Sequence, residues 1–176
     1  MNKLLRLTRY DWPLHFILFF TNWLPDNIAL IKLRGWLARP FFKKAGKNLQ
    51  IGRNVTFYNS SNISIGDDVY IAFGCWFSSK EEIIIKDKIL FGPYVVVVTS
   101  NHSIKNNTYY EGPPINIAKI TINKGAWIGA HVTILPGTNI GQASLVAANS
   151  VISGYTEDYC IYGGIPAKFI KRASIN

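Results

Sequence analysis

Three histidines, at positions 15, 102 and 131, are the side chains of this 176-residue chain best suited to general-base chemistry near neutral pH. His102 follows the aliphatic run Val95–Val98 and stands within the polar stretch Thr99–Ser103. A base at the junction of a rigid element and a loop is held firmly and still reaches a substrate. Spacing alone leaves two interpretations open, a catalytic base or a surface loop histidine.

The other histidines and the cysteines favour structural roles. His131 is expected at a solvent-facing corner, and His15 lies in an apolar N-terminal segment as a packing or surface residue. No two histidines have the short spacing of a metal site, so no metal is expected. Cys75 and Cys160 lie far apart and beside no histidine, which argues against a disulfide framework and against thiol catalysis. Cys75 is interpreted as a packing residue.

A repeat of six residues organises most of the chain. Its longest run consists of Ile122, Ile128, Ile134, Ile140, Val146 and Ile152, and shorter runs consist of Ile51 and Phe57, of Ile65, Ile71 and Phe77, and of Ile85, Phe91 and Val97. The steps from Phe57 to Ile65 and from Phe77 to Ile85 are two residues longer, which indicates a small bulge at a corner. A period of six fits neither an amphipathic helix nor an ordinary antiparallel sheet.

The hexads predict an all-β fold, a left-handed parallel β-helix. Each hexad supplies one short strand and one corner, so three hexads close a triangular coil of about 18 residues. The aliphatic residues then stack inside the prism. Glycine or asparagine is expected where a corner needs positive φ, and turn-tolerant residues follow several ladder positions. These residues are Asn123, Gly129, Gly141 and Ala147.

Two segments lie outside the repeat. Residues 1–45 are expected to form one or two helices that cap the coil, ahead of a β-helix domain over residues 46–172. The aromatic residues of the cap fit either plain hydrophobic capping or a peripheral contact with a membrane surface through Trp12, Phe16, Phe19, Phe20 and Trp23, with Lys3, Arg6 and Arg9 nearby. The second segment, Asn101–Lys119, is a polar insertion, and long insertions in a solenoid usually carry function.

Composition narrows the class of partner. The chain carries 19 Lys and Arg against 10 Asp and Glu, and 48% of its residues are hydrophobic, which excludes a disordered protein. The basic residues are dispersed, so phosphate on a small ligand is favoured over nucleic acid. The stretch Tyr162–Arg172 places three cations on a short C-terminal tail. The apolar run Leu14–Leu24 is too short for a transmembrane span and lacks a signal-peptide cleavage site, so we expect a cytoplasmic protein.

Several motifs resemble the hexapeptide-repeat acyltransferases. They are Trp127–Gly137, Ala147–Val151 and Gly163–Lys168, and the resemblance covers residues 45 to 172. It implies a left-handed parallel β-helix, a homotrimer, and acetyl-CoA bound between neighbouring coils, without a metal. The Asn-His pair that opens the protruding loop is the catalytic position of that family.

The resemblance also implies roles for individual residues. His102 would be the general base that takes the proton from an acceptor hydroxyl, with transfer directly from the thioester. The backbone N–H of Gly129 or Ala130, beside Trp127, would stabilise the oxyanion. Small residues would admit the pantetheine arm, basic residues would lie near the nucleotide phosphates, and the loop over residues 103–114 would reach across the adjoining protomer's site. The residues concerned are Gly129, Ala130, Ala147, Ala148 and Ser153 for the arm, Lys168 and Lys171 for the phosphates, and Asn101, Tyr109, Tyr110 and Glu111 for the acceptor.

The acceptor remains open at this stage. Ala72 stands where galactoside-type acetyltransferases carry an acceptor-binding asparagine. The N-terminal segment is similar to that of sugar O-acetyltransferases from capsule, exopolysaccharide and O-antigen clusters. We expect the protein in the cytoplasm or at the inner face of the membrane. We therefore expect acetyl transfer to a polysaccharide sugar. The alternatives are an antibiotic acetyltransferase that acts on chloramphenicol or a streptogramin, and a non-catalytic trimeric scaffold.

Overall fold

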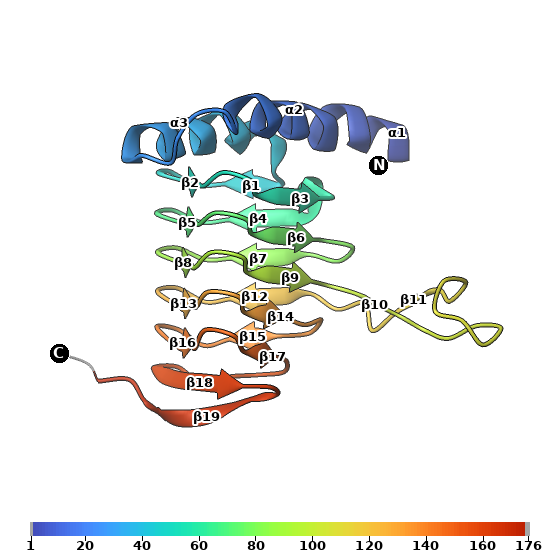
Figure 1. The fold of residues 1–176 in the computed structure, drawn as a ribbon, viewed down its shortest axis with the longest axis vertical. Coiled ribbons are helices and arrows are strands. Elements are labelled where there is room, and N and C mark those ends of the chain that lie inside the picture. The colour runs from blue at the N-terminus through green and yellow to red at the C-terminus, as the bar shows by residue number, and fades with distance from the viewer. Residues whose placement is uncertain (1, 175–176) are drawn as a thin grey trace.

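The computed structural model describes residues 2–174 as a triangular prism of stacked coils with a helical cap across one end (Figure 1). The left-handed parallel β-helix expected from the hexads is confirmed. Two features project from the prism, a long hairpin from its middle and a β-hairpin at its far end (Figure 1).

Three sheets form the sides of the prism. Sheet A contains β1 (Lys44–Ala45), β4 (Ile63–Ile65), β7 (Ile83–Ile85), β12 (Ile120–Ile122) and β15 (Asn139–Ile140). Sheet B contains β2 (Gln50–Ile51), β5 (Tyr70–Ile71), β8 (Leu90–Phe91), β13 (Trp127–Ile128), β16 (Leu145–Val146), β18 (Cys160–Gly164) and β19 (Ala167–Arg172). Sheet C contains β3 (Thr56–Tyr58), β6 (Trp76–Ser78), β9 (Val96–Val98), β14 (Thr133–Ile134) and β17 (Val151–Ile152). We call the corners that join these sheets the AB, BC and CA edges.

Strand register explains the irregular hexads. In sheet B, Gln50 pairs with Tyr70 and Tyr70 with Leu90, whereas Trp127 pairs with Leu145. The N-terminal coils are therefore two residues longer than the C-terminal ones. Part of the excess in the first coil is a 3₁₀ turn, η3 (Ser60–Asn62), at the position of the expected bulge. β1 already pairs with β4, so the coil begins two residues before the expected boundary at residue 46.

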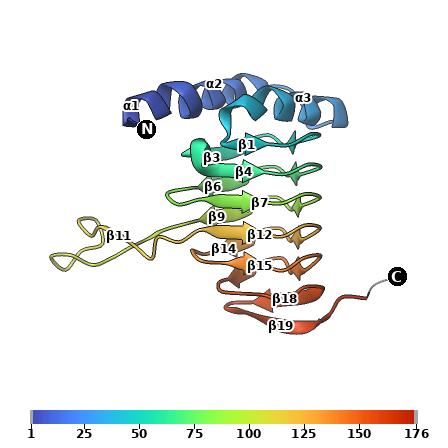
Figure 2. The ribbon, with the colours of Figure 1, turned by 180° about the vertical axis from the view of Figure 1, so that it is seen from behind.

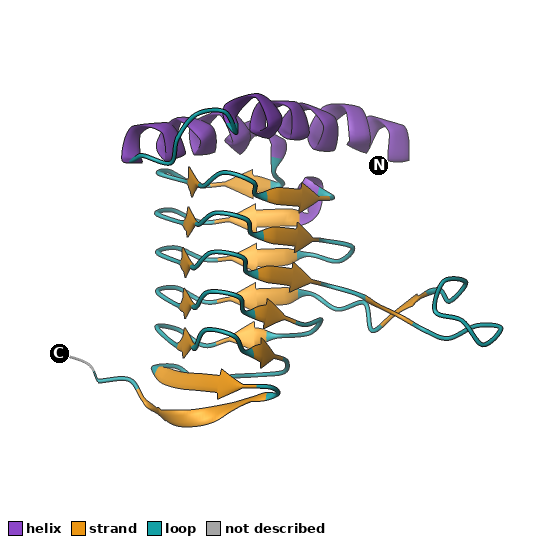
Figure 3. Ribbon diagram, viewed as in Figure 1, coloured by secondary structure: helices purple, strands orange, loops and turns teal. Residues whose placement is uncertain are grey.

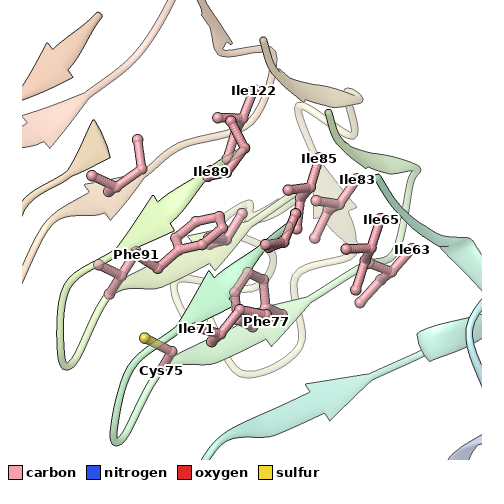
Figure 4. Close-up of a cluster of buried hydrophobic side chains, with 14 of the residues drawn as sticks. Ile63, Ile65, Ile71, Cys75, Phe77, Ile83, Ile85, Ile89, Phe91 and Ile122 are labelled. Atoms are coloured by element: carbon pink, nitrogen blue, oxygen red, sulfur yellow. The ribbon is translucent and has the colours of Figure 1, made fainter. Parts of the chain in front are cut away.

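The ladder residues fill the prism. Phe57 and Phe77 stack in successive coils of sheet C with ring centroids 5.0 Å apart, and Phe77 meets Phe91 of sheet B edge-on at 5.4 Å. Ile63, Ile65, Ile83, Ile85 and Ile122 line sheet A from the inside and are at most 2% exposed (Figure 4). At about 25 cal/mol per Å² of buried apolar surface, this continuous ladder is the main stabilising term of the fold.

Glycine and asparagine supply positive φ at corners as expected, for example at Gly137 (φ 79°) and Asn149 (φ 59°), but not at the positions directly after the ladder residues. Positive φ occurs at the third corner residue, for example Gly125 (φ 77°) and His131 (φ 57°), and is not found at Gly129 or Gly141. A Cβ on Gly129 would lie 2.6 Å from the amide nitrogen of Ala148. Gly129 is thus required because two backbones approach closely, and Asn123, Gly141 and Ala147 likewise do not supply the positive φ.

The cap consists of two helical runs that cross the end of the prism (Figure 3). The first joins α1 (Lys3–Arg6), the π-helical turn η1 (Leu7–Asp11) and α2 (Trp12–Thr21); the second joins α3 (Ile28–Ala38) to the 3₁₀ turn η2 (Arg39–Phe41). Leu14 and Leu18 of α2 and Ala38 of α3 pack against the first coil. No helix among the described residues is long and apolar enough to cross a membrane.

Arg34 anchors the cap to the coil. Its side chain is fully buried and donates hydrogen bonds to the Asp26 carboxylate (3.1 Å) and to the Ile51 carbonyl (2.6 Å). It also donates to the carbonyls of Thr21 (3.1 Å) and Leu24 (3.2 Å), which satisfies the end of α2. One guanidinium therefore joins both helical runs to the first strand of sheet B.

The polar insertion leaves the prism at the CA edge as a hairpin (Figure 2). Its base is the antiparallel pair β10 (Asn101–His102) and β11 (Pro114–Ile115). At the other end of the prism the basic C-terminal segment is part of the fold, because residues 167–172 form β19 and pair with β18.

Candidate active site

His102 stands at the base of the hairpin, on the CA edge. Its backbone pairs with Pro114, and its neighbour Asn101 pairs with Ile115. Directly beyond, the Ser103 amide and hydroxyl both donate to the Pro113 carbonyl, at 3.1 and 2.8 Å. The hairpin thus fixes the backbone of His102, while its exposed imidazole makes no hydrogen bond to any residue in 2–174. The imidazole is thus firmly mounted, and both of its ring nitrogens are available.

The tip of the hairpin carries the expected acceptor-binding side chains. Tyr109 and Tyr110 are 62% and 96% exposed. Glu111 accepts a hydrogen bond from the Asn106 amide at 2.7 Å and does not bond to His102. Gly112 has no room for a side chain, because a Cβ there would collide with the Ser103 carbonyl. The two tyrosines are presented outward, away from the prism of their own chain.

The residues expected to bind the acyl donor line the BC edge. Gly129 and Ala130 follow β13, and Ala147 and Ala148 occupy the same places one coil further on. Trp127 lies on the outside of sheet B immediately before them and is 53% exposed. The structure therefore brings these five residues together as a shallow, small-sided column.

Hydrogen bonding separates the two candidate oxyanion donors. The Gly129 amide donates to the Val146 carbonyl at 2.8 Å and is fully used by the coil. Within residues 2–174 the Ala130 amide has no acceptor. Since an oxyanion needs a donor that is not already engaged, Ala130 is the better candidate.

The remaining expected donor-binding residues divide between two edges. Lys168 pairs with Gly163, which itself contacts Ala147, so Lys168 lies below the BC column. Lys171 pairs with Ile161 and lies further along β19. Ser153 follows β17 and stands on the CA edge with His102, so one chain does not bring it together with the small residues of the BC edge.

The base and the donor column are also separated within one chain. Sheet C lies between the CA edge and the BC edge, and six residues at ~3.3 Å each place them roughly 20 Å apart. The hairpin extends away from the prism and does not fold back over sheet C (Figure 1). A single chain therefore presents two halves of a site on different edges.

Comparison with known proteins identifies the family of this chain. The chain is 30% identical over 160 residues to a dTDP-4-amino-4,6-dideoxy-D-glucose acyltransferase of Escherichia coli, with 76% of this chain and 83% of that protein covered. A hexapeptide-repeat acetyltransferase from Vibrio cholerae, solved with acetyl coenzyme A, is 26% identical with a TM-score of 0.81, and 94% of this chain and 87% of that chain are covered. The chain belongs to the hexapeptide-repeat acyltransferases.

A second relative is matched over only part of its length. This hexapeptide-repeat protein is 29% identical over 152 residues to the galactoside O-acetyltransferase of Escherichia coli strain K12. The match covers 84% of this chain and 65% of that enzyme, so the chain spans less than two thirds of its length. No family model matches the chain.

Sequence reasoning missed an aromatic ladder on the BC edge of this hexapeptide-repeat protein. Arg53 lies over the Phe73 ring, Phe73 meets Tyr94 edge-on at 5.4 Å, and Tyr94 stacks on His131 at 5.0 Å. His131 is at an exposed corner as expected, but it is held by this stack. The sequence signal was the spacing of one coil between the outward-facing rings of Phe73 and Tyr94.

Cys75 is a packing residue in the structure as well. Its thiol is buried in the BC corner and contacts the Gly92 carbonyl at 3.2 Å. Burial raises the pKa of the Cys75 thiol to about 11. No group of three potential metal ligands occurs among residues 2–174.

We expect Cys75 to be inert towards a thiol reagent in the folded protein at pH 8. Its raised pKa keeps it protonated there, and unfolding lowers the pKa to the ordinary value near ~8.5. The raised pKa of Cys75 therefore makes the free energy of unfolding depend on pH. The folded state keeps its full stability below pH ~8.5 and loses stability as pH rises towards 11, because in that range only the unfolded state releases the thiol proton. Titration with dithionitrobenzoate before and after denaturation measures the difference; rapid native labelling of Cys75 would contradict the assignment.

Proposed function

We propose that the protein is an acetyl-CoA-dependent O-acetyltransferase that acts on a hydroxyl group of a sugar. The observation that carries the proposal is the unengaged His102 imidazole on a fixed hairpin, together with the unengaged Ala130 amide beside a column of small residues. Both named relatives act on sugars by their names, a galactoside and a dideoxy-amino-glucose nucleotide. The resemblance of the N-terminal segment adds a role in surface-polysaccharide assembly.

The proposed reaction is a direct transfer. An imidazole nitrogen of His102 takes the proton of the acceptor hydroxyl as its oxygen attacks the thioester carbonyl. The Ala130 amide stabilises the charge on the carbonyl oxygen in the tetrahedral intermediate. The carbon–sulfur bond then breaks, the acetyl group stays on the sugar oxygen, and the proton on His102 passes to the leaving coenzyme A sulfur.

The site is completed in a homotrimer under this proposal. His102 of one protomer would meet the BC edge of its neighbour, which explains why one chain places the two halves on different edges. Tyr109 and Tyr110 would then reach the neighbouring protomer. Ser153, on the CA edge, would line the opposite wall of the same cleft.

The activity is tested by release of free thiol from acetyl-CoA against a panel of acceptors. The panel contains nucleotide-activated sugars, an amino-sugar nucleotide, oligosaccharides, chloramphenicol and a streptogramin. Turnover on a sugar hydroxyl supports the proposal, turnover on the amino sugar redirects it to N-acylation, and turnover only on a drug replaces it by antibiotic acetylation. Absence of both turnover and acetyl-CoA binding would leave the scaffold alternative.

Substituting Ala148 by Trp is expected to raise the KM for acetyl-CoA by about tenfold or more, because an indole would fill the small-sided column. Ala148 is exposed, so the fold should tolerate the change. Lys124→Trp is the matched control, since Lys124 occupies the same corner position on the AB edge and is also exposed. Equal KM values for the two variants would show that the BC edge does not bind acetyl-CoA.

Mixing two impaired variants tests the shared site. Trimers that contain both His102→Ala and Ala148→Trp protomers should regain about a third of the wild-type activity at acetyl-CoA concentrations below the raised KM, because one of their three interfaces joins an intact histidine to an intact column. Co-expression with two affinity tags isolates the mixed trimers. A site built within one chain would give no recovery.

A further inference from the structure

The outer face of the helical cap is apolar, the reverse of an ordinary surface helix. Along η1 and α2, large apolar side chains other than the buried Leu14 and Leu18 are exposed. They are Trp12 (51% exposed), Phe16 (56%), Phe19 (53%), Phe20 (68%) and, just beyond the helix, Trp23 (84%). Trp12 and Phe19 lie at the margin of this surface, where they line hollows beside Thr56 and Phe57 of the first coil. A solvent-facing stripe in a water-soluble domain is normally polar. Plain capping of the coil leaves these side chains unexplained, because Leu14 and Leu18 already perform it.

The second helix of the cap extends the same surface. Leu33 and Trp36 of α3 are 40% and 63% exposed, opposite the buried Ile31 and Arg34. α2 and α3 lie side by side across the end of the prism (Figures 1 and 2). The apolar residues of both helices therefore form one surface at the capped pole of the molecule. We call it the polar-end platform, after its position at the pole and not after its chemistry.

Charge around the platform is one-sided. Residues 1–45 contain eight Lys and Arg and two acids, Asp11 and Asp26. Both acids are engaged, since Asp11 accepts from the Ser60 amide at 3.0 Å and Asp26 from the Arg34 guanidinium and the Arg53 amide. Lys3 and Lys32 are exposed beside the apolar residues. Arg34 is buried on Asp26, and Arg6 and Lys43 pair with Asp11 and Glu82, so the exposed Lys3 and Lys32 are cations that no carboxylate among the described residues neutralises.

Exposed aromatic residues with a cationic rim match the interface of an anionic bilayer. Trp and Phe lie in the headgroup region, and Lys side chains reach the lipid phosphates. No described helix can span the membrane, and the helices lie crosswise to the prism axis, so they would lie in the membrane plane. A second copy stacked on the same pole would bring two cationic rims together. Charge thus favours lipid over self-association.

We propose that the polar-end platform, residues Trp12–Trp23 with Leu33 and Trp36, binds the surface of a membrane that contains anionic phospholipid. The prism axis then stands away from the bilayer, with the β18–β19 hairpin farthest from it (Figure 1). The platform requires neither His102 nor the BC edge. Its occupancy is therefore independent of the proposed acetyl transfer.

Vesicle flotation of the full chain tests this proposal. Wild-type protein is expected to float with phosphatidylcholine vesicles that contain phosphatidylglycerol, and much less with phosphatidylcholine alone. Brominated lipid should quench its fluorescence through Trp12, Trp23 and Trp36. His102→Ala should float like wild type, which separates this result from the enzymatic one. Wild-type protein that stays at the bottom with both vesicles would overturn the proposal.

Two variants and a control identify the surface. Phe16→Ser, Phe20→Ser and Trp23→Ser combined should lower the bound fraction about tenfold or more, and Lys3→Glu with Lys32→Glu should abolish the preference for phosphatidylglycerol. Tyr155→Ser with Ile165→Ser, two exposed positions outside the cap, should float like wild type. All three should keep the wild-type unfolding midpoint, because the side chains are exposed.

Two further outcomes would count against lipid. If the triple serine variant floats as well as wild type, the platform is not the binding surface. If wild type ignores vesicles and light scattering gives it twice the mass of the serine variant, a second copy covers the platform.

Discussion

His102→Ala is expected to lower the rate of acetyl transfer by roughly 10²–10⁴-fold while leaving acetyl-CoA binding unchanged. The imidazole is the exposed base that the hairpin mounts on the CA edge, and acetyl-CoA is assigned to the BC edge. Removing the base should therefore affect kcat and spare the donor. Thiol release measures the first quantity, and calorimetric titration of acetyl-CoA measures the second.

The control for this substitution is His15→Ala, which removes an exposed histidine from α2. It should keep wild-type turnover. Wild-type turnover by His102→Ala would falsify the assignment of the base.

Arg34→Met is expected to lower the free energy of unfolding by about 3 kcal/mol. The variant fills the space but leaves the carbonyls of Thr21, Leu24 and Ile51 without their donor in a buried position. Asp26 retains Arg53, whose Nε lies 3.7 Å from its carboxylate, so only part of the ion pair is lost. Urea unfolding measures the change, and hydrogen exchange should show the loss first in α2 and α3.

Arg53→Met is the matched control for this prediction. The Arg53 side chain is 42% exposed and contacts the same carboxylate, so its removal should cost less than about 1 kcal/mol. Equal unfolding midpoints for the two variants would contradict the anchoring role of Arg34. Faster exchange confined to the cap, with protected coils, would identify the cap as a separately opening unit.

The sequence alone was sufficient for the architecture. A ladder residue every six positions, as at Ile122, Ile128 and Ile134, fits a solenoid, and each of these side chains is fully buried. The hexad is a local pattern, because each strand and corner is specified by its own six residues. Because the repeat is local, its interruption after Val97 marks the insertion in the sequence, and His102 lies at the start of that insertion.

Which edge each corner occupies was decided only by the folded coils. Whether a corner belongs to the BC or the CA edge depends on how many residues each preceding strand and corner contains, including the longer N-terminal coils. The sequence therefore did not predict that His102 and Ser153 lie on one edge and Gly129 and Ala147 on another. The choice of Ala130 over Gly129 as the free donor likewise required the hydrogen bonds between coils.

The helical cap shows the same division between what the local sequence specifies and what packing decides. The helical character of residues 3–38 follows from composition and spacing, and so does the mixture of aromatic and basic residues. Which stripe faces the coil does not, because both stripes of α2 are apolar. Packing on the first coil buries Leu14 and Leu18 and leaves Phe16 and Phe20 outside, and this choice creates the outer surface of the cap. Local periodicity thus determined the elements of this protein, and contacts between distant residues determined which of their faces remain available for chemistry and binding.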